Sequence, residues 1–192
     1  MSLVDALFRL RADLEALRVK WALIGGFAVS VYARPRATLD LDLAVSVSDD
    51  REAERLCAAL GARGYELVPQ HAEQEQTGRL AFARLLLPSR AAPPTPLDLM
   101  FAHSGIEPEV VDGAQQLELT EGLRFPVARV GHLIALKILA GRPQDRVDVL
   151  NLLEISDGPE RQRAREALEL IERRGCGRRR DLLAEYDQLV GR

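Results

Sequence analysis

Residues 39–47, LDLDLAVSV, alternate apolar and polar or small side chains with a period of two. This pattern is typical of a half-buried β-strand. Asp40 and Asp42 share one face of that strand, about 6.5 Å apart along the chain. Because neighbouring carboxylates repel each other, the pair indicates either an exposed strand face or a divalent-cation site, for which hard oxygen ligands favour Mg²⁺.

A second constraint lies just upstream, in WALIGGFAVSVYA at residues 21–33. The apolar run is typical of a buried strand, Gly25-Gly26 of a tight turn, and the remainder of a short buried helix. Backbone N–H groups at the start of a helix, with no side chain in the way, bind phosphate. A plain turn is the alternative. The combined order of strand, Gly-Gly turn, helix, loop and Asp-Leu-Asp strand is stronger evidence for a functional site than any of these features alone.

A third carboxylate belongs to a later predicted strand, LDLMFA at residues 97–102, in which Asp98 points away from the side of Leu97 and Leu99. Three carboxylates from two adjacent strands can hold two metal ions, an arrangement used for in-line phosphoryl or nucleotidyl transfer. The sequence therefore predicts Asp40, Asp42 and Asp98 as catalytic and metal-binding residues.

The remaining elements follow from periodicity and from breaker residues. We expect an α+β fold in which a small mixed β-sheet core is flanked by helices, with a helical C-terminal part. The expected division is 1–128 for the core and 129–192 for the helical part. Helices are predicted over 2–18, 50–63, 130–140, from about Asp145 onward, and twice within 159–190; strands are predicted over 65–68 and 80–88, loops over 69–78 and 89–96, and short strands and turns over 104–125.

Composition excludes several classes of protein. The 192 residues suit one domain, or one domain with a helical extension, and no apolar run reaches the roughly 18 residues of a membrane span. Charges at Asp5, Arg9, Arg11 and Asp13 interrupt the N-terminal apolar residues, so a signal peptide is not expected. We therefore expect a cytoplasmic location. The net charge of −3 implies no strong non-specific binding of nucleic acid.

Lys137 stands out because the chain has only two lysines among 26 basic residues. It lies in VGHLIALKILAG with apolar residues on every side. A compact ammonium that meets a phosphate as a point charge is a chemical reason to keep lysine where arginine is otherwise used. The alternative is a lysine whose stem covers the edge of a core helix while its ammonium reaches water.

Together these motifs resemble a known family. ALIGGFAVSVYARPRATLDLDLAV is similar to the core of the polymerase-β nucleotidyltransferase superfamily, in which a Gly-Gly or Gly-Ser turn precedes an hDhD strand. ALKILAGRPQDRVDVLNLL resembles the Lys-containing helix and Arg-x-x-Asp-x-x-Asp stretch of the AbiEii-type branch, which includes toxins of bacterial toxin–antitoxin systems. The resemblance runs from about Trp21 to Leu153.

The resemblance implies a role for each matching residue. Gly25 and Gly26 would bind the nucleotide triphosphate, and Lys137 would contact the triphosphate or the leaving pyrophosphate. Asp40 and Asp42 would ligate the metals. Asp98 would be the third ligand and would help to deprotonate the attacking hydroxyl. The branch often has Gly-Ser at the turn, so Gly26 removes a hydroxyl ligand for phosphate. Further candidates are Arg36 and Thr38 in the loop before the Asp-Leu-Asp strand, where Arg36 either contacts phosphate or only balances the acidic pair, and Arg142, Asp145 and Asp148, whose roles are open.

The predicted function is an Mg²⁺-dependent transfer of a nucleoside monophosphate from an NTP to a hydroxyl, with release of pyrophosphate. Two ions are expected, and Mn²⁺ is an alternative. The acceptor is a tRNA end, a protein hydroxyl or a small molecule, and the resemblance alone implies a toxin with an antitoxin partner. One rival is a non-catalytic module of the same fold that binds a nucleotide or a partner protein. Another is a small-molecule transferase acting on a cationic acceptor.

Overall fold

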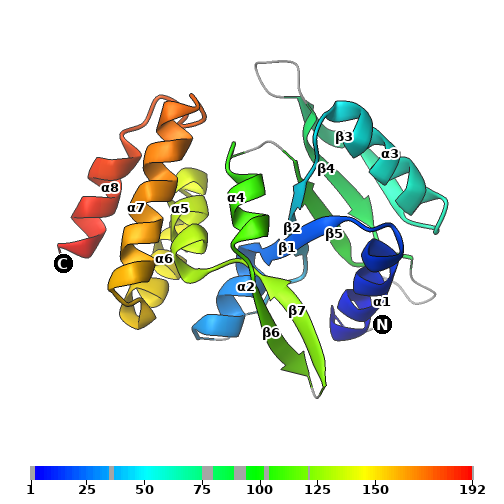
Figure 1. Cartoon of the computed structure of the whole chain (residues 1–192), viewed down its shortest axis with the longest axis horizontal. Coiled ribbons are helices and arrows are strands. Elements are labelled where there is room, and N and C mark those ends of the chain that lie inside the picture. Colours follow the sequence, from blue (N-terminus) through cyan, green and yellow to red (C-terminus); the bar gives the residue numbers. More distant parts are fainter. Residues whose placement is uncertain are drawn as a thin grey trace.

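The computed structural model describes residues 3–34, 37–74, 80–88, 94–101, 104–120 and 122–191. In these residues a seven-stranded sheet with the order β3-β4-β5-β2-β1-β7-β6 crosses the molecule, and eight helices surround it (Figure 1). The strands are β1 (Lys20–Ile24), β2 (Leu41–Ser46), β3 (Glu66–Gln74), β4 (Leu80–Leu86), β5 (Pro96–Met100), β6 (Gln115–Thr120) and β7 (Leu123–Val127). The helices are α1 (Leu3–Ala16), α2 (Gly25–Tyr32), α3 (Asp50–Gly61), α4 (Glu107–Asp112), α5 (Val130–Ala140), α6 (Pro143–Ile155), α7 (Gly158–Arg173) and α8 (Leu182–Val190).

The sheet is mixed, as the sequence predicts. β2 lies in its centre, antiparallel to β1 and parallel to β5, while β1 is also parallel to β7. On one face of the central strands Leu41, Leu43 and Leu97 are fully inaccessible to solvent, and on the other face Ala44 and Asp98 are buried. The α+β prediction is confirmed, and the arrangement places the predicted carboxylate strands next to each other at the centre of the molecule.

Two predicted boundaries near this sheet are wrong. The predicted loop at 69–78 is strand as far as Gln74, because β3 pairs with β4 along an edge of the sheet. The strand predicted from Leu39 begins at Leu41, so Asp40 immediately precedes β2. Backbone pairing with a neighbouring strand decides both limits, and a polar or apolar pattern along the chain does not specify it.

Two helices also differ from the expectation. α4 forms within the stretch predicted as short strands and turns; Pro108 lies in its first turn and Val110 and Val111 are buried. α6 begins at Pro143, two residues before the predicted start, because proline has a helical φ and its missing N–H has no partner to lose in a first turn. Both corrections involve segments that line the site described below.

Helices α5–α8 lie together at one end of the molecule (Figure 1). α5 packs against α2, α6 and α7, which explains why its sequence is apolar on nearly every side. β7 ends at Val127 and α5 begins at Val130, and one apolar core extends across this junction from α1 to α8. The division at 128/129 into two domains stays a prediction. Within the described residues, no helix combines the length and apolar character required of a membrane span.

Candidate active site

Two aspartates lie side by side on neighbouring strands. β2 and β5 are parallel, and their register places Asp42 directly beside Asp98. Asp98 is buried, with 5% of its surface exposed, whereas Asp42 lines a cavity. Asp40 lies just outside the start of β2. The chain thus brings two of the three predicted carboxylates into register, and an arginine described below links Asp98 to the third.

Gly25 leaves the space that the Asp42 carboxylate occupies. Its φ of +67° lies in the left-handed region, and a Cβ at this position would fall 1.9 Å from Oδ2 of Asp42. The backbone N–H of Gly26 donates a hydrogen bond to Asp42. The Gly-Gly turn therefore packs against the carboxylate of the next strand, which brings the predicted phosphate-binding turn and the Asp-Leu-Asp motif into direct contact.

The electrostatics around Asp42 favour a cation. Burial, the nearby Asp98 and, more weakly, Asp40 raise the pKa of Asp42 to about 6, while Lys137 and the Gly26 hydrogen bond oppose the rise. The raised pKa means that burial and the neighbouring negative charges disfavour the ionised carboxylate. The positive and hydrogen-bonding groups around it offset this only in part, so the ionised carboxylate is under-compensated. A positive ligand at this position would relieve that imbalance.

Arg84 is the residue of the site that sequence analysis missed. Its Nε and Nη2 donate to the two carboxylate oxygens of Asp98, at 2.6 Å each, and Nη2 also lies 3.6 Å from Oδ2 of Asp40. Arg84 projects from β4, directly opposite Asp98 on β5. The available signal was a lone charge in the apolar run LAFARLLL. A charge in such a run indicates a partner on the next strand.

The metal prediction can be tested against these contacts. Within the described residues, no group of three or more His, Cys, Asp or Glu side chains is arranged to hold a metal ion. The guanidinium of Arg84 lies against Asp98 and Asp40, so a metal ion held by these carboxylates would compete with it. Each carboxylate oxygen has two lone pairs, so an arginine contact does not use up the donor set. Asp42 and Asp98, two hard oxygen donors that lie side by side, fit Mg²⁺, although the three aspartates together do not form a metal-binding group in the described residues.

Lys137 occupies the other side of the same cavity, where it is held by two aspartates of α6. Its ammonium lies 2.8 Å from Oδ1 of Asp145 and 2.9 Å from Oδ2 of Asp148. Oδ2 of Asp145 also accepts a hydrogen bond from the backbone N–H of Arg142, so this carboxylate joins Lys137 to the start of α6. All of these acidic and ammonium groups are buried. Asp145 and Asp148 therefore hold the ammonium of Lys137 by two ion pairs.

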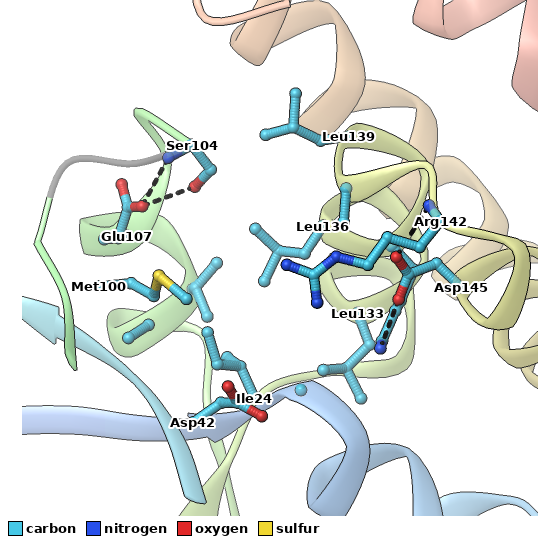
Figure 2. Close-up of a pocket in the computed structure, with 15 residues that line it drawn as sticks. Ile24, Asp42, Met100, Ser104, Glu107, Leu133, Leu136, Leu139, Arg142 and Asp145 are labelled. Carbon is cyan, nitrogen blue, oxygen red and sulfur yellow. Dashed lines mark hydrogen bonds and ion pairs between the residues drawn. The ribbon is translucent and has the colours of Figure 1, made fainter. Parts of the chain in front are cut away.

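The cavity lies between the sheet and α5 (Figure 2). Asp42 and Gly25 line one side, Arg142 and Asp145 line the side formed by α6, and Ser104 and Glu107 line a third. Leucines of α5 and apolar residues of the sheet and α4 form the remaining surface. The full lining comprises Ile24, Gly25, Asp42, Ala44, Met100, Ser104, Glu107, Val110, Leu133, Leu136, Lys137, Leu139, Ala140, Arg142 and Asp145.

Of the two candidates in the loop before β2, Thr38 belongs to the described residues. The Oγ of Thr38 donates a weak hydrogen bond of 3.3 Å to the carbonyl of Asp40, which connects the loop to the acidic strand. Arg36 lies outside the described residues.

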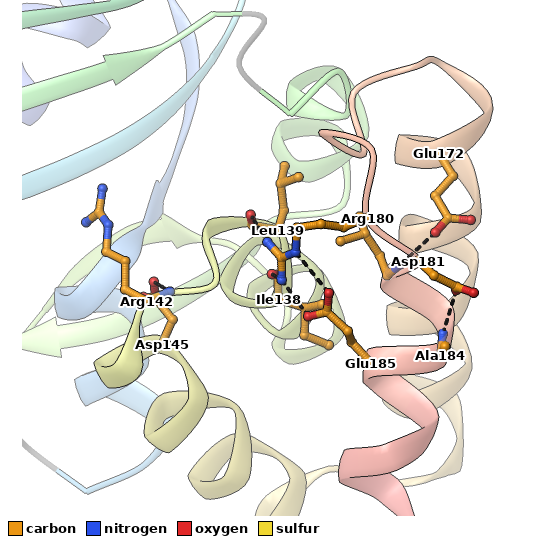
Figure 3. Close-up of polar contacts among 10 residues, drawn as sticks. Ile138, Leu139, Arg142, Asp145, Glu172, Arg180, Asp181, Ala184 and Glu185 are labelled. Atoms are coloured by element: carbon orange, nitrogen blue, oxygen red, sulfur yellow. Dashed lines mark hydrogen bonds and ion pairs between the residues drawn. The ribbon is translucent and has the colours of Figure 1, made fainter.

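The C-terminal helices brace this site from outside. Arg180 donates to the carbonyls of Leu139 and Ile138, at 2.9 and 3.0 Å, and forms an ion pair with Glu185 (Figure 3). The carbonyls are the last acceptors of α5, and Gly141 leaves room for the guanidinium, since a Cβ there would lie 2.6 Å from Nη1 of Arg180. Arg180, the last residue of the arginine-rich stretch RRGCGRRR at 173–180, thus fixes the end of the helix that carries Lys137.

Solved nucleotidyltransferase structures share this fold at low sequence identity. The antigenic nucleotidyltransferase-like protein from Paracoccidioides brasiliensis is 20% identical; the match covers 90% of this chain and 87% of that chain, with a TM-score of 0.54. ANT(2″)-Ia in complex with adenylyl-2″-tobramycin is 13% identical; the match covers 98% of both chains, with a TM-score of 0.50. These likenesses concern the fold. No curated protein matches the chain.

The family is shown by a match over nearly the whole chain. Residues 5–189 match the family model described as nucleotidyl transferase AbiEii toxin, type IV TA system. The match includes the Gly-Gly turn, the aspartate strands and the helix with Lys137. The chain therefore belongs to the AbiEii family of nucleotidyltransferase toxins.

Proposed function

We propose that this protein transfers a nucleoside monophosphate from an NTP to a hydroxyl acceptor in an Mg²⁺-dependent reaction and releases pyrophosphate. The observation that carries the proposal is the register of Asp42 and Asp98 beside Gly25, on a cavity that Lys137 and Arg142 also line. Asp42 on one side of this cavity would attract a cation, and on the other side Arg142 would attract phosphate beside Lys137, whose charge is shared with Asp145 and Asp148. An Mg–nucleotide complex carries both kinds of group.

Asp40, Asp42 and Asp98 would hold the metal, as two ions, with Mn²⁺ as an alternative. When bound, the metal supplies Lewis acidity, which lowers the pKa of the acceptor hydroxyl and neutralises charge on the leaving pyrophosphate. Asp98, which Arg84 holds in one orientation, would accept a hydrogen bond from the attacking hydroxyl.

The remaining polar residues bind the nucleotide. Gly25 and Gly26 form the turn on which the triphosphate would lie, and Lys137 and Arg142 supply positive charge across the cavity. Asp145 and Asp148 hold the ammonium of Lys137 in position. Thr38 positions the loop before β2, and Arg36 is a further candidate for phosphate contact.

The family also supports a biological role. We propose that the protein is the toxin of a toxin–antitoxin pair, that it acts in the cytoplasm, and that an antitoxin partner counteracts it. The acceptor is a tRNA end, a protein hydroxyl or a small molecule.

Labelling experiments test this proposal. The protein is incubated with each labelled NTP, Mg²⁺, total RNA and lysate protein, and the labelled fraction identifies the acceptor. We expect pyrophosphate release that stops on chelation of the metal and in Asp42→Asn. If NTPs bind but no fraction becomes labelled and no pyrophosphate appears, the chain is a nucleotide-binding module without catalysis.

A further inference from the structure

Arg84 contacts two of the three aspartates of the proposed metal site. Its Nε and Nη2 donate to the two carboxylate oxygens of Asp98, at 2.6 Å each, and Nη2 lies 3.6 Å from Oδ2 of Asp40. One guanidinium therefore bridges a carboxylate on β5 and a carboxylate just before β2. A cross-strand ion pair requires only the contact with Asp98. The approach to Asp40 ties Arg84 to the acidic group as a whole.

The guanidinium lies between a partly exposed carboxylate and a buried one. The exposed fraction of the side chain is 39% for Asp40, 29% for Arg84 and 8% for Asp98. Among the described residues, Asp42 lines the cavity and Asp98 does not. Asp98 is therefore the least accessible of the three carboxylates, and both of its oxygens already have a cationic donor.

These contacts leave Asp42 and Asp40 as the more available oxygen donors. Proteins commonly bind Mg²⁺ with one or two carboxylates, while water and the phosphates of the substrate supply the remaining ligands. The positive charge of Arg84 also repels a divalent cation from the same acidic group. We therefore expect such a cation to bind weakly until a nucleotide adds its phosphate oxygens.

We propose that Arg84 is the resident counter-ion of this acidic site and keeps it from binding a divalent cation in the absence of a nucleotide. The cation then enters together with the NTP, whose phosphates supply the missing oxygen ligands. The inference rests on the proposed function, because it concerns the metal ion of that reaction. It gives Arg84 a role in the binding of the metal as well as in the orientation of Asp98.

A purely structural role of Arg84 predicts a different result. In that case its hydrogen bonds to Asp98 stabilise the pairing of β4 with β5, and their loss lowers the free energy of unfolding without a change in affinity for a cation. The affinity of the nucleotide-free protein for a divalent cation therefore separates the two roles.

Mn²⁺ is the probe for this test, because the free ion is counted by electron paramagnetic resonance. We expect the nucleotide-free parent protein to bind Mn²⁺ with a dissociation constant of about 1 mM or weaker. In Arg84→Gln, whose amide can still donate to Asp98, the affinity should increase at least about tenfold. The gain should disappear when Arg84→Gln is combined with Asp42→Asn. Arg124→Gln, which removes the same charge from an exposed position on β7, should keep the parent affinity.

A second measurement uses the parent protein alone and does not depend on the folding of any variant. Inorganic triphosphate takes the place of the NTP, and its binding is followed by calorimetry. If the cation enters with the phosphates, triphosphate should bind at least about tenfold more tightly with Mg²⁺ than without it, and Mg²⁺ alone should bind weakly.

Three results overturn the inference. They are a micromolar affinity of the nucleotide-free parent protein for Mn²⁺, an unchanged affinity in a folded Arg84→Gln variant, and equal binding of triphosphate with and without Mg²⁺. Failure of the proposed function is recognised separately, because the parent protein would then release no pyrophosphate from any NTP. An active parent whose Arg84→Gln variant binds Mn²⁺ no more tightly would keep the transfer reaction and lose only this role of Arg84.

Discussion

Arg84 donates two hydrogen bonds of 2.6 Å to the two carboxylate oxygens of Asp98, from the directly opposite position on the adjacent antiparallel strand. The planar guanidinium matches the two oxygens of a carboxylate, which a lysine ammonium cannot do. Arg84 thereby fixes the orientation of Asp98 beside Asp42. A residue that touches none of the proposed substrates thus determines how one proposed ligand is presented.

Replacing Arg84 should therefore lower kcat more than it raises the KM for NTP. We expect about a tenfold to hundredfold decrease in Arg84→Lys, which keeps the charge but loses the paired hydrogen bonds. Arg84→Met should also lose about 3 kcal/mol in free energy of unfolding, because Asp98 is left buried and unpaired. Steady-state pyrophosphate release and urea unfolding measure the two effects. A parent-like kcat in Arg84→Met would show that Asp98 needs no orientation.

Gly25→Ala should abolish transfer. The new Cβ would fall 1.9 Å from Oδ2 of Asp42, so the carboxylate must move. The matched control is Gly175→Ala, which has a similar φ of +77° but nothing within 4 Å of its Cβ. Both variants carry left-handed strain of about 1–2 kcal/mol, and only Gly25→Ala should lose pyrophosphate release. Equal activities in the two variants would separate the Gly-Gly turn from the chemistry.

Asp42→Asn should lose transfer while the fold survives. In the absence of metal at pH 8, its free energy of unfolding should equal the parent value or exceed it by up to about 3 kcal/mol. The reason is that ionised Asp42, with a pKa of about 6, is destabilised by burial and by Asp98. Chemical denaturation with chelator, paired with the transfer assay, tests both expectations. Full activity in this variant would exclude Asp42 as a metal ligand.

His132 should make the protein less stable below neutral pH. Burial, reinforced by Arg163, lowers the pKa of His132 from 6.5 to about 4, and its Nδ1 has no partner in the described residues. Between these two pH values the unfolded chain binds more protons than the folded chain, so stability falls as pH decreases. The loss is about 2 kcal/mol at pH 5.

Asp42 acts in the opposite direction over nearly the same range. Its pKa is raised, so the folded chain takes up the extra proton and gains about 1 kcal/mol between pH 8 and pH 5. His132→Phe should therefore be more stable at pH 5 than at pH 8 without metal, whereas Asp42→Asn should show the full histidine loss. Urea unfolding at the two pH values decides this. An unchanged pH dependence in His132→Phe would mean that His132 is not buried in its neutral form.

Lys137→Ala should raise the KM for NTP at least about tenfold, the loss expected for one charged hydrogen bond. It also leaves Asp145 and Asp148 buried without their partner, which should remove about 3–5 kcal/mol of stability. Lys137→Arg should restore NTP use in part. Arg180→Gln is the control for stability, since it weakens the end of the same helix outside the cavity. Pyrophosphate release is measured against NTP concentration below the melting transition. A parent-like curve for Lys137→Ala would limit Lys137 to a structural role.

The sequence predicted those parts of the fold whose local pattern and tertiary environment agree. α5 is buried among other helices, and its apolar sequence predicted its limits at 130–140. The alternation in β2 and β5 predicted two strands with Asp42 and Asp98, and the resemblance to a family predicted that both belong to one site. Their register was open until β2 and β5 were paired.

The missed features all depend on contacts between distant segments. Arg84 became part of the site only through the β4–β5 pairing, which no local pattern specifies. Glu107 escaped notice because α4 has six residues, too few to establish a helical period. The partners of Lys137 follow a helix break at Gly141, so their approach depends on how α6 turns back against α5.

The pairing of β1 with β7 determines when the site can form during synthesis. β1 is made early, yet Leu23 pairs with Val127, which is made after the other six strands of the sheet. Such long loop closures slow folding and favour late assembly. A nascent chain that ends within β6 already contains all three aspartates and β2, but it lacks β7, the other neighbour of β1, and the helix that carries Lys137. Nucleotidyl transfer should therefore be confined to chains synthesised through α6, so that a toxin of this design is inactive while it is being made.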